Sequence, residues 1–129
     1  MELKQYFTDR KGFGVLSTAD GEGNVDSAVY SRPHVMEDGT IAFIMNDRLS
    51  HHNLQSNPKA AYLFREGEEG YRGKRFFMTK VKEEQDTELL KELKRRVYTS
   101  DKAKAESRFL VFFRIDKELP LIGPGEEPR

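Results

Sequence analysis

Two arginines, two serines and the start of a predicted helix lie close together in the sequence and could jointly bind an anion. Ser31 and Arg32 end one predicted strand, and Arg48 and Ser50 begin a helix that stops before Pro58. The first N–H groups of a helix have no partner inside it and lie at the positive end of the helix dipole. A phosphate prefers such a position, and arginine adds charged, fork-shaped donors. The pattern predicts a phosphate-bearing cofactor held between a strand end and a helix start.

Simpler interpretations apply to each residue taken alone. A single Arg32 or Arg48 is best read as a solvated surface arginine, and only the combination favours an anion site. Of the three histidines, His51 and His52 are adjacent on a helix and point about 100° apart. His34 would have to converge with one of them, and no acidic residue is placed to complete a metal site. We therefore predict no metal.

Composition excludes several other classes of function. The chain has 129 residues, which fits one domain over 1–129, and 22 basic residues balance 22 acidic ones. This balance argues against a general nucleic-acid binder or a protein of anionic membranes. There is no cysteine, which excludes thiolate metal sites and a cysteine nucleophile. The start MELKQYFTDRKG lacks the apolar run of a secretory signal, and no segment approaches the ~20 apolar residues of a membrane span. We expect a cytoplasmic protein.

Hydrophobic patterning predicts a mainly β protein with a few helices. We expect helices at 2–10, 48–54 and 86–98, and strands at 13–18, 25–31, 41–45, 60–64, 73–82 and 109–115. Six short strands with few helices between them favour a small closed antiparallel barrel. The Pro/Gly-rich tail from residue 119 is expected to be flexible.

Three of the expected strands are apolar on both faces and need a covering surface outside the barrel. They are 41–45, 60–64 and 109–115. The simplest cover is a second copy of the chain, so the pattern favours a homodimer.

One run of the sequence, SRPHVMEDGTIAFIMNDRLSHHNLQSNPKAAYLF, combines three features in order. A strand ends in Arg-Pro, an Asp-Gly turn leads into an apolar strand, and a polar turn leads to Asn-Leu-x-x-Asn-Pro and another apolar strand. This combination resembles the core of the pyridoxamine 5'-phosphate oxidase-like, FMN-binding split-barrel family. The resemblance covers about residues 14–64 and is weaker over 76–82 and 109–115. It implies a six-stranded antiparallel split barrel and a homodimer with two FMN sites at the subunit interface.

The resemblance also implies which residues would contact FMN. The strand segment along the flavin and its phosphate would be Tyr30, Ser31, Arg32 and Pro33. The residues bordering the isoalloxazine ring would be Ile44, Met45 and Asn46. Those holding the phosphate and ribityl chain would be Arg48, Leu49, Ser50 and Asn53.

Two departures from the family pattern change what is expected. Many members carry a lysine about where this chain has Ser50, so Arg48 is expected to supply the charge. The authentic oxidase has a C-terminal segment with Trp, Arg and His, whereas this chain has no Trp and ends LPLIGPGEEPR. This difference argues against oxidation of pyridoxamine phosphate.

Two functional classes remain. The first is an FMN-dependent oxidoreductase of unknown small-molecule substrate, in which the flavin does the redox chemistry. The second is a non-catalytic protein, either a flavin carrier or electron-transfer protein, or a haem-binding relative on the same barrel. The fold does not decide between them. No catalytic residue is assigned, although His34 and Tyr30 are acid or base candidates beside the expected flavin strand.

Overall fold

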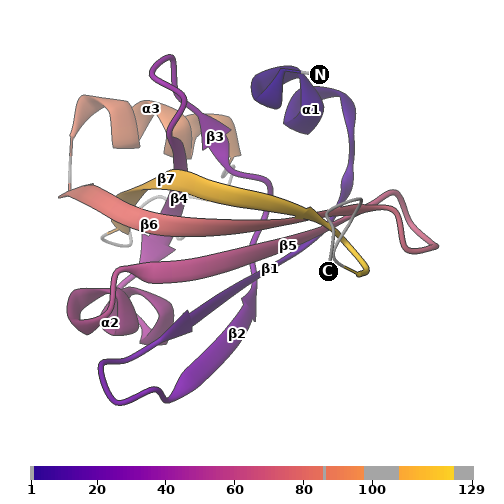
Figure 1. The fold of residues 1–129 in the computed structure, drawn as a ribbon. Helices are drawn as coiled ribbons and strands as arrows, with labels where there is room; N and C mark the ends of the chain where they lie inside the picture. Colours follow the sequence, from indigo (N-terminus) through magenta and orange to yellow (C-terminus); the bar gives the residue numbers. More distant parts are fainter. Residues whose placement is uncertain (1, 86, 98–107, 124–129) are drawn as a thin grey trace.

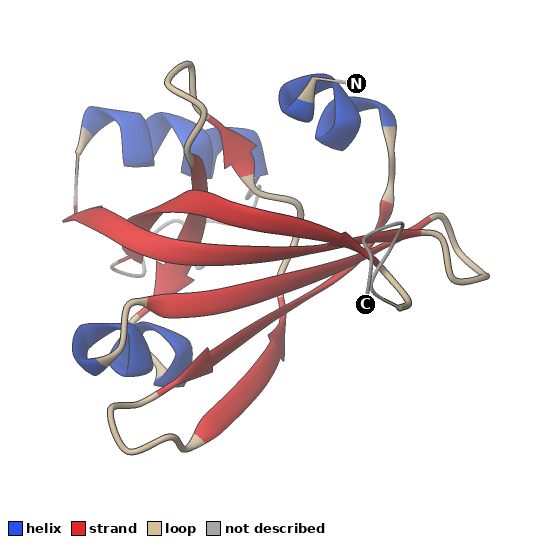
Figure 2. Cartoon of the chain, in the orientation of Figure 1, coloured by secondary structure: helices blue, strands red, loops and turns tan. Residues whose placement is uncertain are grey.

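The computed structural model describes residues 2–85, 87–97 and 108–123. Within these ranges three helices accompany seven strands that form one sheet (Figures 1 and 2). In chain order the elements are α1 (Leu3–Asp9), β1 (Gly12–Ala19), β2 (Val25–Val29), β3 (His34–Val35), β4 (Ile41–Asn46), α2 (Leu49–Ser56), β5 (Lys59–Glu66), β6 (Gly73–Gln85), α3 (Glu88–Val97) and β7 (Arg108–Pro120).

The sheet is antiparallel throughout and its strands run in the order β2-β1-β5-β6-β7-β4-β3. β2 and β3 are therefore opposite edges, although only residues 30–33 separate them in the chain. So short a connection requires the sheet to curl until its two edges come near each other. The edges are not hydrogen-bonded to each other, so the barrel stays open on this side.

This arrangement corrects the expectation of six strands in a closed barrel. The strand expected at 25–31 ends at Val29, and a separate short strand, β3, begins after Pro33. Proline has no N–H to donate to a sheet ladder, and it restricts the residue before it to extended backbone. The chain can therefore leave one sheet edge before Pro33 and join the other after it.

The barrel interior is filled by aromatic and aliphatic side chains. Its largest fully buried members are Tyr62, Phe64, Phe76, Phe113, Leu16, Ile41, Met45, Met78 and Val111. α1 adds Tyr6 and Phe7 to this core, and Figure 1 shows that helix beside the end of the barrel where β3 lies. The Phe7 ring packs edge-on against Phe64 with ring centroids 5.4 Å apart.

A second cluster lies on the outer face of β4 and β7, where α3 packs. Leu90 and Leu93 of α3 contact Ala42, Leu110 and Phe112. Two of the three strands predicted to be apolar on both faces are thus covered by a helix of the same chain. The two-faced pattern of β4 and β7 therefore does not by itself require a partner subunit.

The C-terminal part of the sheet is longer than the sequence pattern predicts. β6 continues to Gln85, and β7 continues to Pro120, where Leu119 pairs with Arg75. Arg75 also donates to the carbonyl of Pro120 at 2.9 Å. The tail expected to be flexible from residue 119 thus begins as paired strand. The charged stretch at 102–106 lies outside the described residues. In the described ranges no helix combines the length and apolarity needed to cross a bilayer.

Candidate functional site

A cavity of about 1160 Å³ lies between β2, the 30–33 connection, β4 and the start of α2. It occupies the side on which the barrel is open. Nine of the eleven residues predicted to contact a cofactor line it: Tyr30, Ser31, Arg32, Pro33, Ile44, Asn46, Arg48, Leu49 and Ser50. The structure thus brings the predicted strand end and helix start to one cavity. α1 contributes Lys4, Phe7 and Thr8 to its lining, and α3 contributes Leu89 and Leu93.

Met45 and Asn53 do not line the cavity. Met45 is 1% exposed and belongs to the barrel core. Asn53 is buried, and its amide donates to the hydroxyl of Thr18 on β1 at 3.1 Å. Asn53 therefore attaches α2 to the sheet and does not reach the cavity.

The start of α2 offers backbone donors to the cavity. Arg48 is the N-cap and its side chain makes no capping bond. The N–H of His52 donates to the carbonyl of Arg48 at 2.9 Å, so the N–H groups of Leu49, Ser50 and His51 precede that helical bond. An anion in this corner of the cavity would meet those N–H groups and the Arg48 side chain.

Arg32 has a different set of partners. Its Nη1 donates to the carbonyl oxygens of Phe7 at 2.6 Å and Arg10 at 2.8 Å, at the C-terminal end of α1. A guanidinium suits this position because the last carbonyls of a helix have no partner inside it. Arg32 lines the cavity while joining the 30–33 connection to α1. Its contact with a phosphate stays a prediction.

The 30–33 connection is fixed at its first residue by a close crossing of chains. The N–H of Tyr30 donates to the carbonyl of Gly14 at 3.0 Å, and the Tyr62 hydroxyl donates to the carbonyl of Tyr30 at 3.1 Å. A Cβ at Gly14 would overlap that hydroxyl, so the crossing requires glycine. Burial raises the pKa of Tyr62 well above its usual range, so the hydroxyl remains a donor.

Asn46 provides a test of whether a flavin fits the cavity. Its Oδ1 is buried and has no hydrogen-bond partner among the described residues, and Asn46 lines the cavity. A buried acceptor without a donor is unfavourable, so this position suits a ligand N–H such as that of a flavin ring. Asp26 disfavours an anion at the helix start, because its carboxylate lines the cavity there. The Ser50 hydroxyl makes a long contact to this carboxylate, at 3.4 Å. The residues fit the ring and the phosphate, and the carboxylate of Asp26 opposes the phosphate near the helix start.

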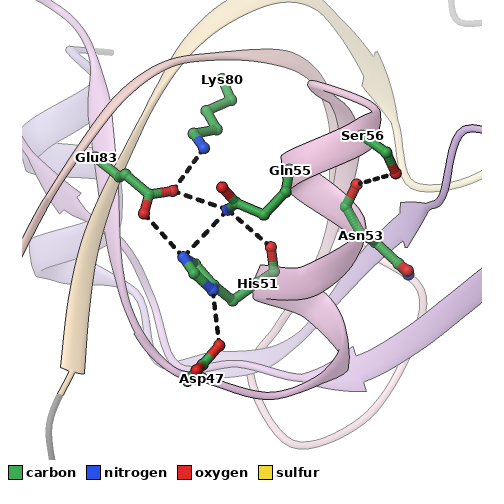
Figure 3. Close-up of polar contacts among 7 residues, drawn as sticks. All are labelled: Asp47, His51, Asn53, Gln55, Ser56, Lys80 and Glu83. Carbon is green, nitrogen blue, oxygen red and sulfur yellow. Dashed lines mark hydrogen bonds and ion pairs between the residues drawn. The ribbon is translucent and has the colours of Figure 1, made fainter.

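Sequence reasoning missed a polar cluster behind the start of α2 (Figure 3). The two ring nitrogens of His51 face carboxylates, Nδ1 that of Asp47 at 3.1 Å and Nε2 that of Glu83 at 2.9 Å. We expected no acidic residue to be placed where it completes a metal site with the histidines, and did not foresee that two carboxylates contact the His51 ring. The Asp47–His51 spacing of four residues was a readable signal, whereas Glu83 comes from β6. Within the described ranges no three His, Asp or Glu side chains are grouped to hold a metal ion.

No protein-family model matches the sequence, and no curated protein is similar to it. Several solved structures are similar in fold. An FMN-binding protein from Syntrophomonas wolfei subsp. wolfei is 23% identical, with a TM-score of 0.76 over 93% of this chain and 84% of that one. The haem storage protein HutZ from Vibrio cholerae is 18% identical, with a TM-score of 0.70 over 93% and 95% of the two chains. A putative pyridoxamine 5'-phosphate oxidase from Lactobacillus delbrueckii is 13% identical, with a TM-score of 0.62 over 92% of each. At these identities the likeness shows a shared fold.

Proposed function

We propose that this chain, which has the split-barrel fold of the pyridoxamine 5'-phosphate oxidase-like proteins, binds FMN and acts as a flavin-dependent oxidoreductase on a small molecule. One observation carries the proposal. A single cavity is lined both by the N-terminal end of α2 and by Asn46, whose buried Oδ1 has no hydrogen-bond partner among the described residues. The first suits a phosphate and the second suits a ring N–H, and FMN presents both groups.

In this proposal the chain binds and orients FMN, and the bound flavin supplies the redox chemistry. The N–H groups at the start of α2 and the Arg48 guanidinium hold the phosphate, with Arg48 in place of the family's lysine. Tyr30, which follows β2, and Ile44 of β4 would border the flavin ring system, since both line the cavity. His34 lines the same cavity and, with Tyr30, is an acid or base candidate.

The test compares FMN with riboflavin, which lacks the phosphate. We expect FMN to bind about 10–100-fold more tightly, because charge-assisted hydrogen bonds to the phosphate are absent for riboflavin. Arg48→Ala should weaken FMN by about tenfold or more and leave riboflavin nearly unchanged. Quenching of flavin fluorescence measures both affinities.

The matched control for that test is Arg72→Ala. Arg72 is exposed in the β5–β6 loop and does not line the cavity. Its variant should bind both flavins as the wild type does. Equal affinity of the wild type for FMN and riboflavin would contradict the phosphate site. Bleaching of the bound flavin by an electron donor, followed by reoxidation with a candidate substrate, distinguishes an enzyme from a flavin carrier.

A haem carrier is the second candidate. Its supporting observation is that His34 lines the cavity, since imidazole is a common axial haem ligand. One protein of similar fold is described as a haem storage protein. Added haemin should then give a Soret band that His34→Ala shifts or abolishes. A flavin spectrum in the purified protein, without such a band, favours the FMN proposal.

We further propose a homodimer formed through an apolar face of β1, β2 and β5. Val15 pairs with Val29 on one side and with Leu63 on the other, so the three side chains lie on one face of the sheet. Phe13 and Val25 share that face by alternation. Exposed fractions of 67% for Val29 and 38% for Leu63 show that the described residues leave the face uncovered. The paired Ser17 and Ser27 lie on the same face, between Val29 and Val25. An exposed apolar patch such as that of Val15, Val29 and Leu63 suits a protein partner.

A second copy is the occupant that we assign to this face. Val29 belongs both to the apolar face and to the cavity lining, so a copy bound there would lie beside the cavity. Light scattering of the purified protein at micromolar concentration tests the assembly.

A further inference from the structure

One face of α1 forms part of the cavity wall, away from the start of α2. Lys4, Phe7 and Thr8 all line the cavity, and their spacing of three and four residues places them on the same face of the helix. Figure 1 shows α1 and α2 well apart. The α1 side chains therefore belong to a part of the cavity that is separate from the proposed phosphate position.

This part of the cavity has two cationic side chains with unused donors. The Lys4 ammonium makes no hydrogen bond or ion pair with the described residues. Arg32 uses Nη1 for the carbonyls of Phe7 and Arg10, at 2.6 Å and 2.8 Å, and its Nη2 and Nε make no hydrogen bond within the described part of the chain. These two nitrogens form an edge of the guanidinium that can bind both oxygens of a carboxylate. The contact with α1 thus fixes the guanidinium and leaves this edge available.

The charges that line the cavity are unevenly distributed. Arg48 and Asp26 lie at the α2 end, and Glu37 belongs to the β3–β4 hairpin. The α1 side has Lys4 and Arg32, so both of its charged lining residues are positive. A part of a cavity lined in this way attracts anions.

The cavity is also larger than one cofactor requires. Its volume of about 1160 Å³ exceeds the range of about 300–1,000 Å³ that is usual for a site holding one drug-sized ligand. Beside the two cations the lining is apolar, because Phe7 shares the helix face of Lys4 and Pro33 follows Arg32 in the chain. A molecule bound here meets apolar surface next to two positive charges.

Resting on the proposed function, we propose that the α1 side of the cavity is a substrate subsite and that the substrate is a small carboxylic acid with an apolar body. Lys4 and the Nε–Nη2 edge of Arg32 hold the carboxylate, and Phe7 and Pro33 contact the apolar part. One guanidinium edge and one ammonium suit a monoanion, whereas the helix start offers the larger set of donors that suits a phosphate. Cofactor and substrate thus occupy different parts of one cavity.

The experiment follows the backbone amide signals of isotope-labelled protein by NMR while benzoate is added, with benzamide as the neutral probe of the same shape. It is done without FMN and with FMN bound. In both states we expect benzoate to shift the signals of α1 and of Arg32 and His34, and to bind about three- to tenfold more tightly than benzamide. Lys4→Gln should remove most of this preference and leave benzamide binding unchanged.

Lys11→Gln is the matched control, because Lys11 is exposed just after α1 and does not line the cavity. It changes the net charge by the same amount as Lys4→Gln and should bind both probes as the wild type does. Lys4 is itself exposed, so its replacement should not disturb folding.

Equal affinity of the wild type for benzoate and benzamide overturns the inference, and so does an unchanged preference in Lys4→Gln. Benzoate that shifts the signals at the start of α2 instead, or that FMN displaces, overturns it as well, because the two anions then share one position. Phenyl phosphate that binds the α1 side more tightly than benzoate overturns the assignment of a carboxylate. If benzoate binds at α1 as expected and the protein binds no FMN, the anion subsite stands and the proposed function is refuted.

Discussion

Asp26 lies on β2 and lines the cavity close to the proposed phosphate position. The Ser50 hydroxyl is directed to its carboxylate, although the contact is long at 3.4 Å. A phosphate bound at the start of α2 would be repelled by this carboxylate and would compete with it for Ser50. On the proposed function, this carboxylate would therefore weaken the binding of the phosphate.

Asp26→Asn should strengthen FMN binding. It removes the repulsion and leaves an amide that can still accept a hydrogen bond from Ser50, so we expect a several-fold lower dissociation constant for FMN. Riboflavin should change little. Glu37→Gln is the control, since Glu37 also lines the cavity but lies on the β3–β4 hairpin. Weaker FMN binding in Asp26→Asn would show that the carboxylate supports the cofactor and that the phosphate lies elsewhere.

Single residues also show which parts of the candidate site could be predicted from the sequence. Helix-start chemistry and spacing predicted that Arg48 and Ser50 would share a cavity with Ser31, and the structure places all three there. The partners of Arg32 could not be predicted, because the carbonyls that it binds come from α1, far away in sequence. The contact between His51 and Glu83 could not be predicted for the same reason, since Glu83 comes from another element.

Among the elements, α2 depends on contacts with strands. It has no capping side chain, and its buried residues include Ser50, His51, Asn53 and Leu54. Asn53 attaches it to β1, and the His51–Glu83 contact attaches it to β6. A helix this short has little stability of its own, so these contacts keep its first turn in place.

Glu83→Gln tests the contact between α2 and β6 through its pH dependence. The pKa of Glu83 is about 2 in the folded chain against an ordinary 4.5. A lowered folded pKa means that the carboxylate stabilises the fold fully above about pH 4.5, and that this contribution is lost as the pH falls toward 2. Thermal unfolding followed by circular dichroism should show a Tm at pH 6 a few degrees lower in Glu83→Gln than in the wild type.

The difference between the two proteins should then shrink as the pH falls from about 4.5 to 2. Asp20, Asp38 and Asp116 also have lowered pKa values, but they are common to both proteins and cancel in the comparison. Glu84→Gln is the control on the same strand, because the ion pair of Glu84 is with the exposed Lys82. A Tm difference that stays constant with pH would mean that the charge of Glu83 does not contribute.

Most of the predicted elements are present in the structure. The errors concern the lengths and partners of the strands, and they have one cause. Alternation and turn residues located the strands, because these signals are local. Lengths and partners depend on tertiary contacts. β7 continues past the predicted end at residue 115 since β6 pairs with it to Pro120, and β4 is apolar on both faces since α3 covers it.

At the scale of the whole molecule, the open side of the barrel determines where the cavity lies. The sequence resemblance predicted the split barrel, and the fold comparisons agree with it, but the structure has a seventh strand and a sheet that does not close. The cavity lies at this opening, and the apolar face of β1, β2 and β5 adjoins it through Val29. The proposed homodimer would cover that face and stand beside the cavity.

Leu63→Arg tests the homodimer and its link to the cofactor together. Leu63 is 38% exposed on the β5 side of the apolar face, where it pairs with Val15, so a charged side chain there meets water in a monomer but is desolvated in a dimer. We expect the variant to fold with nearly the wild-type Tm and to be monomeric by light scattering at micromolar concentration, where the proposed homodimer predicts a dimeric wild type. If the second copy completes the cavity wall at Val29, FMN affinity should fall with the loss of the dimer and recover in part at high protein concentration.

Tyr71→Arg is the matched control, because Tyr71 is 78% exposed in the β5–β6 loop, and this variant should remain dimeric with FMN bound. A wild-type monomer that binds FMN fully would refute the dimer, and a Leu63→Arg dimer would place the subunit contact on another face.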